Sequence, residues 1–235
     1  MARWHNRLTV LFPMGFSMRL IVLGLFTVAV ALGSAGSAKA DYVLWQDPAT
    51  GVSLSWPDTW KMVSNADPDD VVTIMAPSGR AHAACRLRAR DDARYLIYPP
   101  YYSPDIQRVA YSFDFWDRYL GEYTGHQIYS MRDGAGIGRG FASYVEAGYE
   151  SAVQGPEMRR QALALASLYN GTAYIFECSS HQDAFSLWKG PFLSIAKSID
   201  FKKAHHELRS GNYRDFMADP RIEFHAERGD ARITY

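Results

Sequence analysis

The stretch MRRQALALASLYNGTAYIFEC, residues 158–178, decides the fold of this chain. Two runs typical of β-strands, 158–169 and 172–178, lie on either side of Asn170-Gly171. A two-residue turn of type I′ needs positive φ at both central residues, and Asn-Gly is the pair that adopts it most readily. The stretch therefore predicts a β-hairpin and, with it, an antiparallel sheet.

Shorter strand-like runs lie toward the N-terminus of this hairpin. Apolar residues alternate with polar ones over 52–56, a β-branched run occupies 71–75, and apolar residues alternate again over 83–89. Residues 77–79, Pro-Ser-Gly, form a turn signal between the last two runs. We expect those two runs to pair as a second hairpin.

A glycine-rich segment, 133–140, separates two further strand-like runs at 126–132 and 141–149. Its Gly-x-Gly-x-Gly-x-Gly spacing matches neither the dinucleotide-binding fingerprint nor the phosphate loop. It also joins strand to strand, so no helix N-terminus would be available to hold a phosphate. We interpret it as a flexible hairpin or bulge loop, and we predict no cofactor.

Two helices are expected beside these strands. Ser112 is a typical N-cap, and the helix after it should run through Leu120 and stop at Gly121. Apolar residues recur at spacings of three and four over 183–198, which indicates an amphipathic helix that Pro191 splits or kinks. The fold class is therefore α+β, an antiparallel β-sheet flanked by helices.

The first and last elements resemble those of the PsbP-like group, which includes the PsbP subunit of photosystem II and the Ran-binding Mog protein. GVSLSWPDTWK, residues 51–61, is similar to the group's opening strand, and the hairpin at 169–171, the strand into Cys178 and the segment 198–201 are similar to its closing elements. The resemblance covers about residues 42–201. It implies an α/β/α sandwich with 198–201 as an exit strand, and a non-enzymatic module that binds or assembles other proteins. It implies no functional residue.

The first forty residues have the three parts of a secretory signal peptide. They hold basic residues and no acid, a nearly apolar run over 20–32, and small residues that end in Ala-Lys-Ala. We expect cleavage after Ala40 and a periplasmic or secreted protein beginning at Asp41. The apolar run is shorter than the roughly 20 residues that span a bilayer, which disfavours a retained anchor. Met14 and Met18 are alternative starts.

The remaining chain is mildly acidic and should form one domain, 41–201, followed by a polar tail, 202–235, that is docked or flexible. Four of the 25 bases and none of the 25 acids lie in the leader, so 21 bases face 25 acids, a net charge of −4. This charge gives no attraction to nucleic acid or anionic lipid, so neither is an expected partner. His205, His206 and His225 lack the spacing of metal ligands, and we predict no metal site.

The chain has two cysteines, Cys85 and Cys178. In an oxidising compartment an even pair is most simply a disulfide. A redox-active pair is disfavoured because no Cys-x-x-Cys motif is present.

An aromatic loop is the first candidate binding site. Three prolines within 95–104 exclude a continuous helix or a central strand. Tyrosines pair a flat apolar ring with a hydroxyl group, which suits protein interfaces and sugar rings. The alternative is that the loop folds back as a lid on the core. The candidate residues are Tyr95, Tyr98, Tyr101 and Tyr102.

Arginines at alternate positions form the second candidate. Arg86, Arg88 and Arg90 share one face of a strand and would bind a carboxylate, a sulfate or an acidic partner. The alternative is that they pair with acids on neighbouring strands, such as Glu146 and Glu150.

No catalytic motif stands out, and a Gly-x-Ser-x-Gly elbow is absent from the sequence. The sequence therefore favours a non-enzymatic interaction or assembly module of the cell envelope. A small-ligand or glycan-binding domain that uses the tyrosines with Arg86 and Arg88 is the first alternative. A hydrolase without a recognisable motif is the second.

Overall fold

The structure is a computed structural model that describes residues 41–65, 67–152, 157–204, 226–227 and 230–231. The predicted signal peptide, most of the predicted tail and the three histidines of that tail lie outside the described residues. In the tail, β10 (Ala226–Glu227) pairs antiparallel with β11 (Asp230–Ala231).

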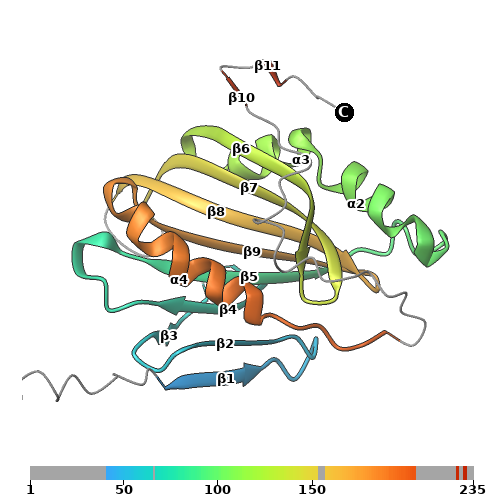
Figure 1. The fold of residues 1–235 in the computed structure, drawn as a ribbon, viewed down its shortest axis with the longest axis horizontal. Helices are drawn as coiled ribbons and strands as arrows, with labels where there is room; N and C mark the ends of the chain where they lie inside the picture. The colour runs from blue at the N-terminus through green and yellow to red at the C-terminus, as the bar shows by residue number, and fades with distance from the viewer. Residues whose placement is uncertain (1–40, 66, 153–156, 205–225, 228–229, 232–235) are drawn as a thin grey trace, which may run out of the picture. The chain divides into compact units, whose positions relative to one another are not determined.

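The predicted hairpin is present and lies within a seven-stranded antiparallel sheet (Figure 1). It consists of β8 (Met158–Tyr169) and β9 (Thr172–His181). Asn170 has φ +48° and Gly171 has φ +76°, so both central residues adopt the positive φ that the turn requires.

The other strands extend the sheet on both sides of this hairpin. The strand order is β3-β4-β5-β9-β8-β7-β6, and every neighbouring pair is antiparallel. The expected hairpin around 77–79 is formed by β4 and β5. The bounds are β3 (Lys61–Val63), β4 (Asp70–Met75), β5 (Ala84–Asp91), β6 (Thr124–Ile137) and β7 (Gly140–Ser151).

A separate two-stranded sheet precedes it, made of β1 (Tyr42–Gln46) and β2 (Ser53–Pro57). We did not expect β1 or β3, because β1 has mostly exposed side chains and β3 has only three residues. Neither strand gives an alternating apolar pattern.

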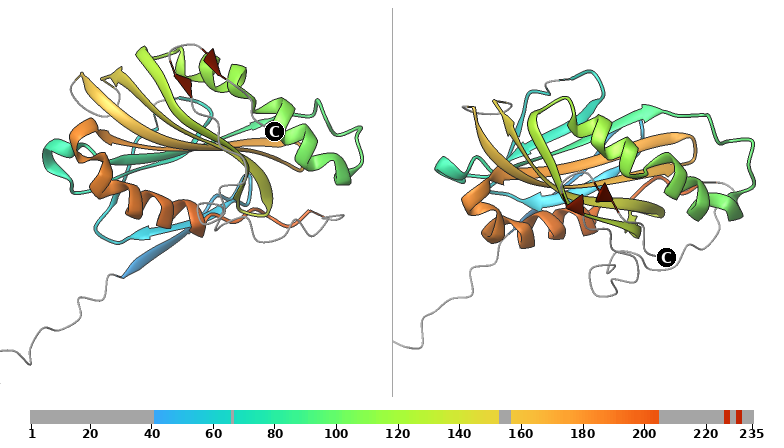
Figure 2. Two further views of the ribbon diagram at one scale, coloured as in Figure 1. Left: turned by 45° about the horizontal axis from the view of Figure 1, so that its top comes forward. Right: turned by 90° about the horizontal axis from the view of Figure 1, so that it is seen from above.

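Helices cover both faces of the large sheet (Figure 2). One face packs against α4 (Phe185–Ser198), whose Phe185, Phe192 and Ile195 lie in the larger core. The other face packs against α2 (Ser103–Ala110) and α3 (Phe113–Leu120) around the buried Trp116. Short 3-10 turns lie at Gly79–Ala81, Pro100–Tyr102 and Gln182–Ala184. The predicted α+β class with a flanked antiparallel sheet is confirmed.

Two loop predictions need correction. The aromatic loop ends earlier than expected, because α2 begins at Ser103 and accommodates Pro104 in its first turn, where a proline breaks no intrahelical hydrogen bond. The glycine-rich segment is mostly strand: β6 continues through Ile137, and only Gly138 and Arg139 separate it from β7. The predicted hairpin with a bulge is present, because β6 pairs with β7 and the register shifts between Arg132 and Ala135; only the length of the loop was overestimated.

Two predictions near the last helix also need correction. Pro191 lies inside one continuous helix, which does not split. The preceding residue is Gly190, which has no Cβ to clash with the proline ring. The expected exit strand at 198–201 is reduced to a single bridge between Ser53 and Asp200.

The two cysteines form the predicted disulfide. Cys85 on β5 and Cys178 on β9 are direct cross-strand partners, and their sulfur atoms are 2.06 Å apart. The bond joins residues 93 positions apart in the sequence, so it closes a long loop between two adjacent strands.

Removing this bond should lower stability substantially. We expect the Cys85→Ala/Cys178→Ala variant to lose roughly 4 kcal/mol of unfolding free energy, because the unfolded chain regains the entropy of a long open loop. Urea unfolding followed by tryptophan fluorescence measures this loss. A change below about 1 kcal/mol would contradict the proposed role of the bond.

Candidate functional site

A polar cluster lies on the face of the sheet that α2 and α3 cover. Strands β5, β7, β8 and β9 contribute four of its members, and alternation along each strand brings them to the same face. The other two are tyrosines, one in α3 and one in the segment between α3 and β6. Arg86 on β5 is the cross-strand partner of Glu177 on β9, and Tyr149 on β7 is the partner of Arg160 on β8. The cluster comprises Arg86, Tyr119, Tyr123, Tyr149, Arg160 and Glu177.

Glu177 is the buried acid at the centre of this cluster. Its Oε2 accepts hydrogen bonds from Arg86 Nη2 at 2.9 Å and from the Tyr119 hydroxyl at 2.8 Å. Its Oε1 accepts from the Tyr149 hydroxyl at 2.5 Å. Burial alone would raise the pKa of the Glu177 carboxyl, but the charge of Arg86 and these hydrogen bonds lower it to about 2. Glu177 is therefore a carboxylate at neutral pH.

We call the three predicted arginines of β5, Arg86, Arg88 and Arg90, the arginine strip, and its first two members pair with acids within the protein. Burial alone would lower the pKa of Arg86, and the charge of Glu177 raises it above its ordinary value. Arg88 Nε lies 3.0 Å from Asp70 Oδ1, and both arginines pair with Asp67.

The acids that pair with the strip therefore differ from those we expected, Glu146 and Glu150. Glu146 lies 2.5 Å from Lys189 of α4. The side chain of Glu150 is exposed. The third arginine of the strip, Arg90, is exposed as well.

Arg160 differs from the other buried cation, because it forms no ion pair with an acid among the described residues. Arg160 is 1% exposed. Nε donates to Ser179 Oγ at 3.1 Å and Nη2 to the His82 carbonyl at 2.7 Å, while Nη1 is buried without a hydrogen-bond partner in the described structure. Burial lowers the pKa of the Arg160 guanidinium.

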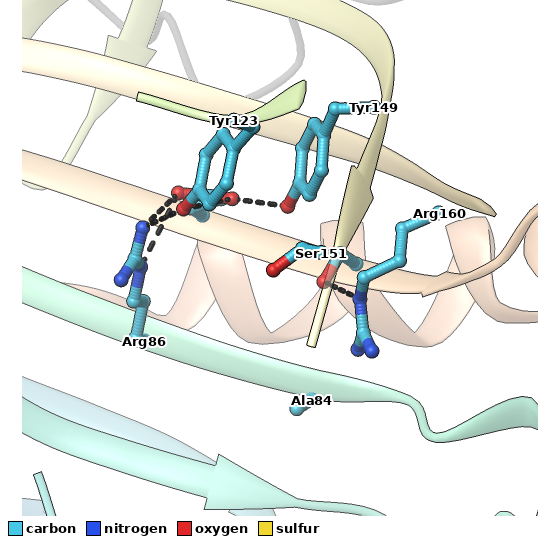
Figure 3. Close-up of a pocket in the computed structure, with 8 residues that line it drawn as sticks. Ala84, Arg86, Tyr123, Tyr149, Ser151 and Arg160 are labelled. Atoms are coloured by element: carbon cyan, nitrogen blue, oxygen red, sulfur yellow. Dashed lines mark hydrogen bonds and ion pairs between the residues drawn. The ribbon is translucent and has the colours of Figure 1, made fainter. Parts of the chain in front are cut away.

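A small cavity of about 20 Å³ lies between Arg86 and Arg160 (Figure 3). Ala84, Ser151 and Ser179 line it together with members of the polar cluster. In the figure, Ser151 lies between the two arginines and Ala84 lies below them. The cavity is therefore walled almost entirely by hydrogen-bonding and charged groups.

The candidate tyrosines follow the C-terminal end of β5, whereas Arg86 and the cavity lie near its start. Tyr95 is half-buried against the apolar cluster around Trp116, whereas Tyr98, Tyr101 and Tyr102 are 50%, 61% and 41% exposed. The rings of Tyr101 and Tyr102 have centroids 4.2 Å apart. The neighbouring apolar side chains are exposed as well. We define the aromatic surface as Leu96, Ile97, Tyr98, Tyr101, Tyr102 and Val109.

The structure therefore separates residues that we had grouped in one ligand site. Arg86 belongs to the polar cluster at the start of β5, and the tyrosines follow the end of that strand. Our sequence reasoning missed Arg160 and Glu177. Each is a charged residue within an apolar strand, and Arg160 is in phase with the buried Ala162, Ala164 and Ala166. That pattern was the available signal.

No protein-family model and no curated protein matches this sequence. Solved structures do resemble it. The cyanobacterial PsbP of Synechocystis sp. PCC 6803 is 16% identical, with a TM-score of 0.45, over 73% of this chain and 99% of that chain. LpqN of Mycobacterium tuberculosis, involved in cell envelope biogenesis, is 12% identical, with a TM-score of 0.42, over 70% of this chain and 92% of that one. The PsbP-like resemblance noted from the sequence thus recurs among solved structures, at TM-scores below 0.5. Such a likeness concerns the arrangement of strands and helices alone.

The ion pair between Glu177 and Arg86 predicts a specific pH dependence of the free energy of unfolding. The pKa of this carboxyl is lowered on folding, so its contribution is complete above about pH 4.5 and is lost as the pH falls toward about 2. This contribution is on the order of 3 kcal/mol. We expect Glu177→Gln to cost roughly 3–5 kcal/mol at pH 7, because Arg86 is left buried without its acid.

Urea unfolding at several pH values measures both effects. The difference between the wild type and Glu177→Gln should shrink as the pH falls through this range. Glu150→Gln, at an exposed acid on β7, should keep the wild-type pH profile. A constant difference between the wild type and Glu177→Gln from pH 7 to pH 2 would contradict the assignment.

Proposed function

We propose that this protein is an exported, non-enzymatic interaction module of the cell envelope that docks on another protein through the aromatic surface. One observation carries the proposal: six large apolar side chains are exposed within residues 96–109. Clustered exposed apolar groups are typical of interaction sites, since water contact with them is unfavourable until a partner covers them.

The composition of this surface favours a protein partner. Three of its six residues are tyrosines, which are enriched in protein interfaces and offer large contact areas with few rotatable bonds. Leu96, Ile97 and Val109 add aliphatic area that hydrogen-bonds to nothing, so a purely polar ligand would leave it uncovered. An envelope protein with an apolar patch of its own is the expected partner.

The polar cluster gives less support to a hydrolase. Its cavity of about 20 Å³ is far below the roughly 300–1,000 Å³ of typical small-molecule sites. Glu177 has a pKa of about 2, whereas a general base works best with a pKa near the operating pH. Its hydrogen bonds to Arg86, Tyr119 and Tyr149 also hold it in place within the protein.

Site-specific photocrosslinking in living cells tests the proposal. A photoreactive residue at Ile97, which is 83% exposed, should give one discrete protein adduct. The Tyr101→Ala/Tyr102→Ala change should reduce that adduct at least tenfold. The double variant should melt within about 2 °C of the wild type, because removing exposed side chains costs little stability.

The matched control places the photoreactive residue at Leu187 of α4, which is 78% exposed outside the aromatic surface. It should give no such adduct. Equal adducts from both positions, or a large loss of melting temperature in the double variant, would contradict docking through this surface. Glycan adducts without a protein adduct would favour the sugar-binding alternative.

Export is the second part of the proposal. Among the described residues, no helix combines the length and apolar character needed to cross a membrane. Support for export comes from the leader sequence and from the buried disulfide, a bond that oxidising compartments maintain. N-terminal sequencing of the protein recovered from the envelope fraction should begin at Asp41. Recovery of the uncleaved chain in the membrane fraction would favour a retained anchor instead.

A further inference from the structure

The buried charge of Arg160 lacks a partner of opposite sign in the described structure. Its Nε and Nη2 donate to neutral oxygen atoms, those of Ser179 and His82, and its Nη1 donates to none. A guanidinium stays protonated in proteins, so this site holds a full positive charge that is almost entirely removed from water. Burying a charge in this way is strongly unfavourable unless an opposite charge approaches it.

The neighbouring acids form their ion pairs with other arginines. Glu177 is matched by Arg86 at 2.9 Å and by tyrosine hydroxyls on both of its oxygens. Asp67 pairs with Arg86 and Arg88, so Arg160 is the cation of the polar cluster that no carboxylate of the described residues pairs with. Arg160 lies on the cavity wall opposite Arg86.

The cavity has the chemistry and the size for a small anion. Besides the two arginines, Ser151, Tyr123 and Tyr149 place hydroxyl groups in its lining. A water molecule needs roughly 10–15 Å³ of cavity, so about 20 Å³ admits one or two atoms of that size. A halide ion or the two oxygens of a carboxylate group match this volume, whereas a tetrahedral phosphate or sulfate is larger.

We propose that this cavity binds a small monovalent anion, either chloride or the carboxylate group of a small acid, with Arg160 as its principal contact. The anion would accept a hydrogen bond from Arg160 Nη1 and give its guanidinium the partner of opposite charge that it lacks among the described residues. This inference does not rest on docking through the aromatic surface, which lies beyond the opposite end of β5.

Chloride NMR of the purified exported protein tests the proposal in phosphate-free buffer. Bound chloride broadens the chloride resonance, so the wild type should show an excess line width that falls as added chloride saturates the protein sites. Arg160→Gln should reduce that excess at least fivefold. Arg159→Gln is the matched control, because it removes the same charge from an adjacent exposed residue, and it should keep the wild-type line width.

Ala84→Val provides a second variant that keeps both arginines. It should fill the cavity floor and reduce the excess line width at least threefold. An intact Cys85–Cys178 bond and a wild-type circular dichroism spectrum confirm that each variant is folded. No excess line width in the wild type, or equal excess in the wild type and in folded Arg160→Gln and Ala84→Val, would overturn the proposal.

Competition identifies the source of the anion. Displacement of chloride by formate and acetate would show that the site accepts a carboxylate group. Displacement by bromide alone would show that it is a halide site. Displacement by phosphate at lower concentrations than formate would overturn the assignment to a small monovalent anion.

Discussion

The register between β5 and β9 is the constraint on which the rest of the structure depends. Two successive cross-strand pairs fix it, Cys85–Cys178 on the α4 face and Arg86–Glu177 on the opposite face. A slip of β9 by one residue would turn Glu177 away from Arg86, toward the apolar core beneath α4, and would separate the two sulfur atoms. The covalent bond and the charge pair therefore specify the same alignment independently.

The polar cluster and the aromatic surface both depart from the usual rule that apolar side chains are buried and charged ones are exposed. At the start of β5, charged groups lie where apolar side chains are expected, and beyond its end, apolar groups lie in water. Departures of this kind concentrate at functional sites, because they lower stability unless something else compensates for them. The rigid strand between them holds the two features apart.

Local signals predicted most of the sheet, and non-local pairing explains most of what they missed. Asn170-Gly171 determined a hairpin by its own backbone preferences, and Ser112 with Gly121 marked a helix correctly. The partner of Arg86 was not predictable in this way, because Glu177 lies 91 positions away and becomes a neighbour only through the strand order. Chain order alone does not reveal that β9 inserts beside β5.

The strand order also has a consequence for how the chain assembles. Strands β3 to β5 and strands β6 to β9 are each joined to their sequence neighbours, and the two groups meet only where β5 pairs with β9. Synthesis begins at the N-terminus, so β5 is made long before β9, its second neighbour in the sheet. Until β9 is made, one edge of β5 stays unpaired and the thiol of Cys85 has no partner. Contacts between such distant segments form slowly. Closure of the sheet is therefore a late event in synthesis, and a nascent chain of this protein is vulnerable to mispaired thiols and to aggregation through that open edge until then.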